Sequence, residues 1–349
     1  MLASVTHILP LTSIRRVRTL PVPGQILVHP GQKVSATDVV AQANIPAEHM
    51  VLDIRRGLGI AQASAAERAI VRQQGDKLTK GDVIAETGGL FSRIVRAPAD
   101  GEIVSISGGQ VLLRVSSRTV EVKAGFMGTV AELIPDYGAA IETSGALVQG
   151  MWGNDKIDNG LLLVIAREPN EELTRPAIDV SMRGAVVLAG HCASQDALRA
   201  GAELPLRGLI LASMTADLVP FAAAQKYPIF VLEGFGNIPM NDVAFRLLSS
   251  SEKREVSINT VFNPALGQRP EVIIPLPSVG TSPRETDYFA PSQTVRIQGA
   301  PYAGKVGTIL QVKPGLSELP NGLRAAAAEV QLDSDTRVLV PLANLEVIE

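Results

Sequence analysis

The residues best placed to do chemistry follow three apolar runs in the middle of the chain. These runs cover residues 184–190, 207–213 and 228–233, and residues with helical spacing follow each of them. The pattern predicts parallel strands, whose carboxyl ends meet at one edge of a sheet, where α/β folds bind their ligands. The candidate ligand-binding residues at that edge are Gly190, Ser194, Ser213, Thr215, Glu233 and Gly234.

Two kinds of chemistry are open to this edge. Gly190 precedes a predicted helix and, with the nearby hydroxyls, could aim backbone N–H groups at an anion such as phosphate. Glu233 ends an apolar strand, where burial would raise its pKa and suit it to act as a base. The alternatives are ordinary turn chemistry for Gly190 and, for Glu233, a helix cap or an ion pair with Arg207 or Arg183. Neither a P-loop nor a Gly-x-Gly-x-x-Gly motif accompanies these residues.

The remaining reactive residue types form no catalytic or metal-binding set. The chain has one cysteine, Cys192, and four scattered histidines without the spacing of a metal site. His191 is adjacent to Cys192, but neighbours on a strand point to opposite faces, so we do not expect a nucleophile–base pair. We therefore predict no catalytic residue, no metal, no cofactor and a buried, unreactive Cys192.

The composition is that of a multidomain globular protein. The 349 residues predict two or three domains, and 46% hydrophobic residues with 31 glycines and 23 prolines fit a turn-rich fold. The net charge of −3 gives no general reason to bind nucleic acid or anionic membrane. No apolar run is long enough to span a bilayer, and the start lacks the basic region of a signal peptide. With a single cysteine, we expect a cytoplasmic protein without a membrane span.

An internal repeat lies in the first third of the chain. Residues 30–41 align without gaps with residues 74–85, and Gly31/Gly75 and Asp38/Asp82 are among the identical pairs. Each copy predicts two short strands about a turn, and the residues between the copies, 62–73, predict a helix. We expect the two copies to pair into one β-sandwich.

The residues that follow the second copy are similar to those that follow the modified hairpin of a known domain type. Residues 97–101 read Ala-Pro-Ala-Asp-Gly, as after the modified hairpin of biotinyl domains, but the tip at residues 87–90 reads Thr-Gly-Gly-Leu and carries no lysine. Residues 20–115 therefore resemble the barrel-sandwich hybrid superfamily. That superfamily includes lipoyl and biotinyl domains, and unmodified versions in RNA polymerase large subunits and in the C subunit of sodium-pumping electron-transport complexes. The resemblance implies a structural module, without covalent biotin or lipoate.

The middle of the chain contains a β-rich segment followed by a segment in which strands and helices alternate. Residues 120–166 predict a small β unit, whose glycine-rich loop 150–160 carries the only tryptophan, Trp152. We interpret Trp152 as a plug over the end of a barrel, and a partner contact is the alternative. Residues 167–277 then predict a small α/β domain of the swivelling type. Its expected helices are 191–203 with Ser194 as N-cap, 215–224 and 241–249, and its last strands are 255–261 and 268–277.

The C-terminal residues 294–349 follow a predicted linker, 278–293. Two strands flank a turn at Gly304 and Lys305, with Gly307 leading into the second. This segment resembles the KOW motif of transcription-elongation factors and ribosomal proteins, which implies an SH3-like barrel that binds RNA or protein. Its five basic and six acidic side chains disfavour a nucleic-acid face. The candidate partner-binding residues of the chain are Trp152, Arg296, Tyr302 and Lys305.

The sequence thus predicts a mixed β and α/β multidomain protein. The expected order is a barrel-sandwich hybrid with an inserted helix (1–119), a small β unit (120–166), an α/β domain (167–277), a linker (278–293) and a KOW-like SH3 barrel (294–349). We expect a non-enzymatic scaffold or adaptor with protein partners in a larger cytoplasmic assembly. The alternatives are a nucleic-acid-, ribosome- or transcription-associated factor acting through the KOW-like barrel, and an enzyme or small-ligand sensor at the α/β strand ends.

Overall fold

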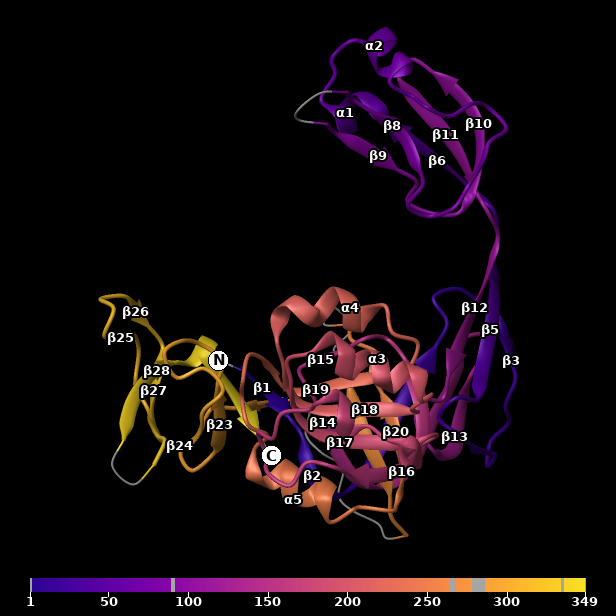
Figure 1. Cartoon of the computed structure of the whole chain (residues 1–349). Helices are drawn as coiled ribbons and strands as arrows, with labels where there is room; N and C mark the ends of the chain where they lie inside the picture. Colours follow the sequence, from indigo (N-terminus) through magenta and orange to yellow (C-terminus); the bar gives the residue numbers. More distant parts are fainter. Residues whose placement is uncertain (1, 89–91, 264–267, 278–285, 334–335, 349) are drawn as a thin grey trace.

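The computed structural model describes residues 2–88, 92–263, 268–277, 286–333 and 336–348. The chain forms a body and a projecting lobe, which comprises residues 48–115 (Figure 1). A two-stranded ribbon, β5 (Val39–Ile45) and β12 (Arg118–Lys123), joins the lobe to the body. The strands nearest the two ends of the chain lie together on another side of the body. Most of the regular structure is β-strand, arranged in several sheets.

The predicted parallel sheet is confirmed at the centre of the body. Its strands run parallel in chain order and are buried on both faces, which explains the unbroken apolar runs in the sequence. α5 packs on one face, and α3 and α4 pack on the other. The bounds are β16 Ile157–Val164, β17 Val186–Cys192, β18 Gly208–Met214, β19 Ile229–Phe235, α3 Gln195–Glu203, α4 Val219–Ala223 and α5 Asp242–Ser249.

The ends of these helices follow from local sequence. Ser194 and Asn241 are the N-caps of α3 and α5, and each side chain accepts a hydrogen bond from a backbone N–H of the first turn. The predicted N-cap at Ser194 is thereby confirmed. Short 3-10 turns complete this part of the chain: η1 (Arg175–Ala177), η2 (Val180–Met182) and η3 (Ala216–Leu218).

Antiparallel strands extend the layer into an eleven-stranded sheet. The strand expected at 255–261 is present as β20, but it runs antiparallel to β16 and so leaves the parallel layer. The strand expected at 268–277 is β21, which pairs with β20 and with the long strand β14. The bounds are β2 Ile8–Thr19, β4 Lys33–Val34, β13 Gly128–Ile134, β14 Gly138–Gln149, β15 Trp152–Gly153, β20 Glu255–Asn259 and β21 Glu271–Pro275.

The lobe has its own hydrophobic core. Its buried residues come from segments between Ile54 and Leu113, and its main sheet has the order β6-β11-β10-β7. The helix expected at 62–73 is shorter, and a second short helix precedes it. The bounds are β6 Glu48–Asp53, α1 Ile54–Leu58, α2 Ala63–Arg68, β7 Lys77–Leu78, β8 Val83–Glu86, β9 Ile94–Arg96, β10 Gly101–Ser107 and β11 Gln110–Val115.

The expected pairing of the two repeat copies into one sandwich is wrong. The first copy lies in the body, where β4 pairs with β13 and β5 pairs with β12 and β3 (Gln25–Ile26). The second copy lies in the lobe, where β7 pairs with β10 and β8 pairs with β9. Each copy takes its partner strands from a different downstream segment, which the alignment of the copies alone could not reveal. The hairpin tip at 87–90 falls partly outside the described residues.

The two copies nevertheless build the same module. Gly31 and Gly75 both have positive φ, 80° and 91°, and each N–H donates to a carbonyl of the pairing strand at 2.8 Å. In both modules a bridge joins the same pair of residue types, Ile26 to Ala41 in the body and Ile70 to Ala85 in the lobe.

The irregularities of the two modules also correspond. In the body, β-bulges interrupt the pairing of β5 with β12 and of β13 with β14. In the lobe, bulges interrupt β8–β9 and β10–β11 at the equivalent places. Bulges are specific features rather than defects, so their shared positions support a duplicated module. The lobe is therefore a second module inserted into the hairpin end of the first, between β5 and β12.

The C-terminal strands form a seven-stranded sheet that also takes the N-terminal strand. β1 (Leu2–Thr6) pairs in parallel with β29 and antiparallel with β22 (Thr286–Tyr288), which lies inside the expected linker. The expected boundary at residue 119 falls within β12. The remaining bounds are β23 Thr294–Ile297, β24 Val306–Val312, β25 Ser317–Glu318, β26 Arg324–Ala325, β27 Ala327–Gln331, β28 Arg337–Pro341, η5 Leu342–Asn344 and β29 Leu345–Ile348. None of the helices in the described part of the chain is both long and apolar enough to cross a membrane.

Candidate functional site

The carboxyl ends of β17, β18 and β19 bring His191, Ser213 and Gly234 side by side. His191 pairs with Ser213 across the sheet, and Ser213 pairs with Gly234. The Ser213 hydroxyl lies 2.9 Å from His191 Nδ1 and accepts a hydrogen bond from the Ile238 N–H at 3.1 Å. Burial lowers the pKa of His191 despite the opposing charge of Glu172. Because Ser213 is fully buried, this pair is enclosed by protein rather than presented to a substrate.

Gly190 packs directly against the backbone of Glu171, and it does not line an anion-binding pocket. A Cβ at this position would lie 2.1 Å from the Glu171 carbonyl oxygen, which accepts a hydrogen bond from the His191 N–H at 2.9 Å. The cavity beside Gly190 has a volume of about 20 Å³. That is room for about one water molecule, too little for phosphate.

The hydroxyls expected near an anion are used within their own turns. Ser194 Oγ accepts from the Asp196 N–H at 3.2 Å as the cap of α3. Thr215 Oγ1 and the Thr215 N–H both lie within hydrogen-bond distance of the Cys192 carbonyl oxygen, at 3.3 and 3.0 Å. This is the ordinary turn chemistry that the sequence offered as the alternative.

Glu233 is buried between the start of α5 and Arg296 of the C-terminal sheet. Its Oε1 accepts hydrogen bonds from the Asn241 N–H at 2.9 Å and from Asn241 Nδ2 at 2.7 Å, next to the start of α5. Its Oε2 lies 2.8 Å from Arg296 Nη2. The alternative of an ion pair with Arg207 or Arg183 is wrong, since the partner, Arg296, comes from the C-terminal sheet. Gly234 follows with a φ of 115°, a conformation that glycine adopts readily.

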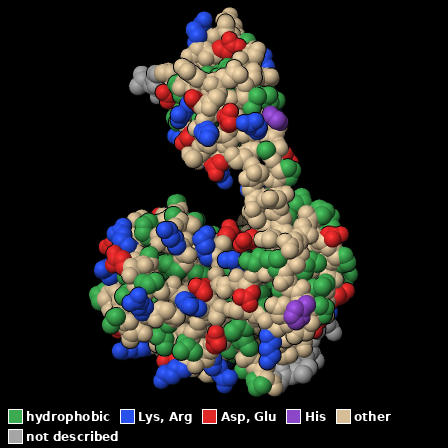
Figure 2. All heavy atoms as spheres, turned by 90° about the vertical axis from the view of Figure 1, so that its right-hand side faces the viewer, with side chains coloured by type: hydrophobic (Ala, Val, Ile, Leu, Met, Phe, Trp, Pro, Cys, Tyr) green, Lys and Arg blue, Asp and Glu red, His purple; other side chains and the backbone are tan. Residues whose placement is uncertain are grey.

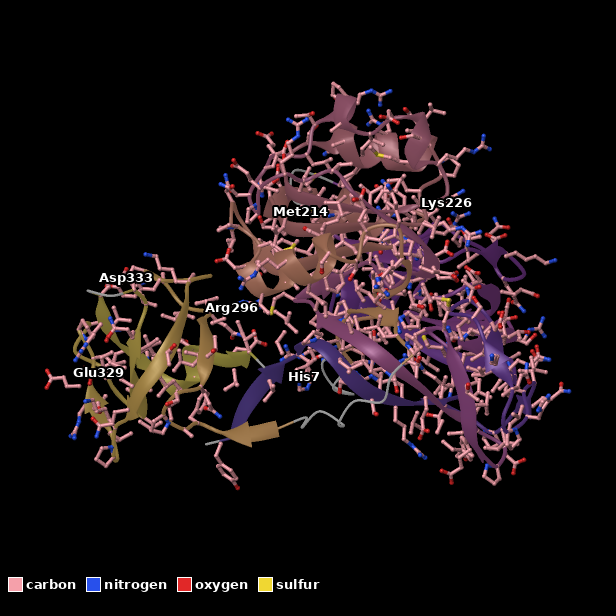
Figure 3. All side chains as sticks on the ribbon, turned by 90° about the horizontal axis from the view of Figure 1, so that it is seen from below. His7, Met214, Lys226, Arg296, Glu329 and Asp333 are labelled. Atoms are coloured by element: carbon pink, nitrogen blue, oxygen red, sulfur yellow. The ribbon has the colours of Figure 1, made fainter. Side chains whose placement is uncertain are left out.

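Arg296 is the centre of a buried ion cluster, which we define as Glu233, Arg269, Arg296 and Glu346. Figure 3 places Arg296 where the C-terminal strands meet the body. Its Nη1 lies 3.4 Å from Glu346 Oε2, and Arg269 Nη1 lies 2.5 Å from Glu346 Oε1. Thr6 on β1 donates its hydroxyl to the same Oε1. The cluster thus joins β19, the C-terminal sheet and the N-terminal strand.

The electrostatics of the cluster favour the ionised form of Glu346. Burial alone would raise the pKa of Glu346, but the hydrogen bond from Thr6 and the charges of Arg269 and Arg296 outweigh it and hold this pKa below its ordinary value. The side chains of Arg296 and Glu346 are 2% and 0% exposed. Two arginines and two glutamates balance in charge, as a buried group of this kind requires.

The candidate partner-binding residues lie in three separate places. Trp152 lies on β15 against the edge of the parallel sheet, with its ring 6.1 Å from that of Phe235, rather than over the end of a barrel. Tyr302 packs partly on the core of the C-terminal sheet, and Lys305 is exposed. Arg296 is buried, so these residues do not form one face.

The turn between β23 and β24, which contains Gly304 and Lys305, packs against the body. A Cβ on Gly304, whose φ is 82°, would lie 2.9 Å from Ile238 Cγ2, in the same loop that donates to Ser213. The turn therefore covers part of the strand-end edge. Sequence reasoning selected Arg296 and Glu233 but missed Glu346, Arg269 and Thr6, because a single polar or charged residue carries no sequence signal of burial.

The only cysteine of the chain, Cys192, is buried at the end of β17. Burial raises the pKa of the Cys192 thiol to about 11, as for an inert, buried cysteine. No group of three or more His, Cys, Asp or Glu side chains in the described ranges could hold a metal ion. A shallow pocket of about 400 Å³ lies elsewhere, between η2 and the end of α3 that is remote from these strand ends.

The lobe is the other candidate functional feature. Figure 2 shows a narrow waist between it and the body, and charged side chains of both signs on its surface. Its edge strand β6 pairs only with β11, and the side chains from Glu48 to Val51 are exposed. In comparisons with known proteins, neither a family model nor a curated sequence matches this chain.

Proposed function

We propose that this protein is a non-enzymatic scaffold or adaptor, and that the lobe is the arm by which it docks onto a protein partner. The observation that carries this proposal is the placement of the lobe, which has its own core and extends from the body on the β5–β12 ribbon (Figure 1). A binding module held away from its base can reach a partner without moving the base.

The construction of the body supports the same role. The buried ion cluster ties β19, the C-terminal sheet and β1 together, so the two ends of the chain are fixed on one base. Breaking one partner of such a pair is costly, and this resists separation of the parts. A rigid base with one projecting module is what an adaptor needs in order to hold two objects at a set spacing.

The two alternatives have less support. On a nucleic-acid-binding face of the C-terminal sheet, Arg296 could not contact phosphate, because its guanidinium lies between two buried carboxylates instead of facing solvent. An active site at the strand ends would have to use Ser213 and Glu233, which are buried and hydrogen-bonded within the protein.

The test removes the lobe and leaves the body intact. Because Ile45 pairs with Arg118 at the end of the ribbon, residues 46–117 can be replaced by an Asn-Gly hairpin turn. We expect the intact chain to form a stoichiometric complex with a protein of its own cell, isolated at native expression level. The shortened chain should keep its thermal transition and lose that complex. Equal complex formation by both chains, or a strictly monomeric intact chain without a partner, would contradict the proposal.

A further inference from the structure

We propose that the free edge of β6 binds an extended segment of the partner by β-strand addition, and that this segment has an apolar centre and a basic residue opposite Glu48. The inference rests on the proposed docking role of the lobe and names the surface and the chemistry of the partner. Strand addition satisfies the unpaired backbone groups of an edge strand with those of a bound peptide.

β6 differs from the other long edge strands of the described sheets. Natural edge strands are protected by charged side chains, especially Lys, by proline or by β-bulges. β2 has Pro10 and a bulge, β12 has Lys123 and a bulge, and β28 ends in Pro341. β6 reads Glu-His-Met-Val-Leu-Asp and pairs with β11 in unbroken register over all six residues. It has no lysine, proline or bulge, and its two carboxylates lie only at its ends.

The exposed side chains of β6 give the edge an apolar centre. Met50 is 39% exposed and Val51 is 59% exposed, and they lie opposite Leu113 and Leu112 of β11. Met50 thus extends the inner face of the sheet and Val51 the outer face. A strand added beside them would continue both apolar rows, and that contact supplies affinity beyond the backbone hydrogen bonds.

The charges at the two ends of β6 favour a partner peptide over a second copy of this chain at the free edge. Glu48 is exposed and has no ion pair among the described side chains, whereas Asp53 at the other end pairs with Arg55. A second copy pairing antiparallel about the centre of β6 would place Glu48 opposite Asp53 at both ends, and like charges directly opposite are destabilising. A partner segment with Lys or Arg opposite Glu48 gains an ion pair instead. We therefore assign the edge to a partner peptide rather than to a second copy.

The test uses the full chain and two fluorescein-labelled heptapeptides. The first is Lys-Val-Thr-Ile-Thr-Val-Ser, whose Lys lies opposite Glu48 when the peptide pairs parallel to β6, and the second has Glu in place of Lys. We expect fluorescence anisotropy to show that the unmodified protein prefers the Lys peptide, by about fivefold for one cross-strand charge pair. Glu48→Lys should reverse the preference. Val51→Lys, which introduces the usual protection of an edge, should abolish binding of both peptides.

The control is Val71→Lys, a change of the same type at another exposed position of the lobe, which should leave binding unchanged. No binding of either peptide, or equal loss in Val51→Lys and Val71→Lys, overturns the inference. Sedimentation that shows a dimer lost in Val51→Lys overturns it in favour of a second copy. If the chain without its lobe loses the cellular partner while Val51→Lys keeps it, the docking role stands and the edge assignment is wrong.

Discussion

Replacement of Arg296 by Met should be among the most damaging single changes to the body. Arg296 lies within 2.8 Å of Glu233 and 3.4 Å of Glu346, and all three side chains are buried. Removing one partner of a buried ion pair costs about 3–5 kcal/mol, because the remaining charge stays buried without compensation. Glu346 keeps Arg269 and Glu233 keeps Asn241, so we expect the lower end of this range, about 3 kcal/mol.

Urea unfolding measures this loss directly. Trp152, the only tryptophan, reports on the parallel sheet through its contact with β19, and far-ultraviolet circular dichroism reports on the whole chain. The matched control is Arg15→Met, which removes a guanidinium that also pairs with two glutamates but is about half exposed. Surface pairs contribute little, so this control should lose far less stability. Equal losses in the two variants would refute the view that the buried ion cluster holds the body together.

The buried ion cluster should also make the stability of the protein depend on pH, through the carboxylate of Glu346. The pKa of Glu346 is lower in the folded protein than in the unfolded chain, so its ionised form contributes stability above its unfolded value of about 4.3. That contribution is lost as the pH falls through the lower folded value. In Arg296→Met one stabilising charge is missing, so acid unfolding should begin at a higher pH than in the unmodified protein. An unchanged acid midpoint would show that Arg296 does not act on this carboxylate.

Three further predictions concern the modules and the lone cysteine. Gly31→Ala and Gly75→Ala should each lower the free energy of unfolding, measured in urea, by about 1–2 kcal/mol. Both glycines have left-handed φ values and occupy equivalent turns. Sharply unequal losses in the two variants would argue against equivalent modules. Cys192 should resist a thiol reagent at pH 8 in the native protein and react fully in urea, since burial raises its pKa to about 11; rapid native reaction would contradict this. Mass spectrometry of the protein from its own cell should find no covalent biotin or lipoate, and either group would contradict the interpretation of the tip at residues 87–90, which carries no lysine, as part of a structural module.

Sequence patterns predicted local structure better than the arrangement of the modules. The buried parallel strands follow from the apolar runs, and the cap of α3 follows from Ser194. The repeat was visible, but the pairing of its copies depended on strands far downstream, such as β10 and β13. The placement of β1 beside β29 joins the two ends of the chain, and no local pattern encodes such a contact.

In the candidate site, too, the sequence identified individual residues but not the contacts between them. Glu233 and Arg296 were each selected as functional residues, one as a base and one as a partner contact, and the structure joins them in one ion pair. A charged residue that ends an apolar strand looks the same in sequence whether it faces a substrate or another part of the same chain. Only the position of its counter-charge separates the two cases, and here that position depends on the packing of the C-terminal sheet.

The nested arrangement of the two modules gives the lobe its reach. In the body module, β5 and β12 form the hairpin that would otherwise close on itself, as β8 and β9 pair in the lobe. Because the ends of such a hairpin are adjacent, an inserted module can fold on its own core without straining the host. The insertion therefore adds length at the one place where the host module already projects. A module placed there adds a separate sheet, in which β6 is an edge strand, beyond the pairing of β5 with β12.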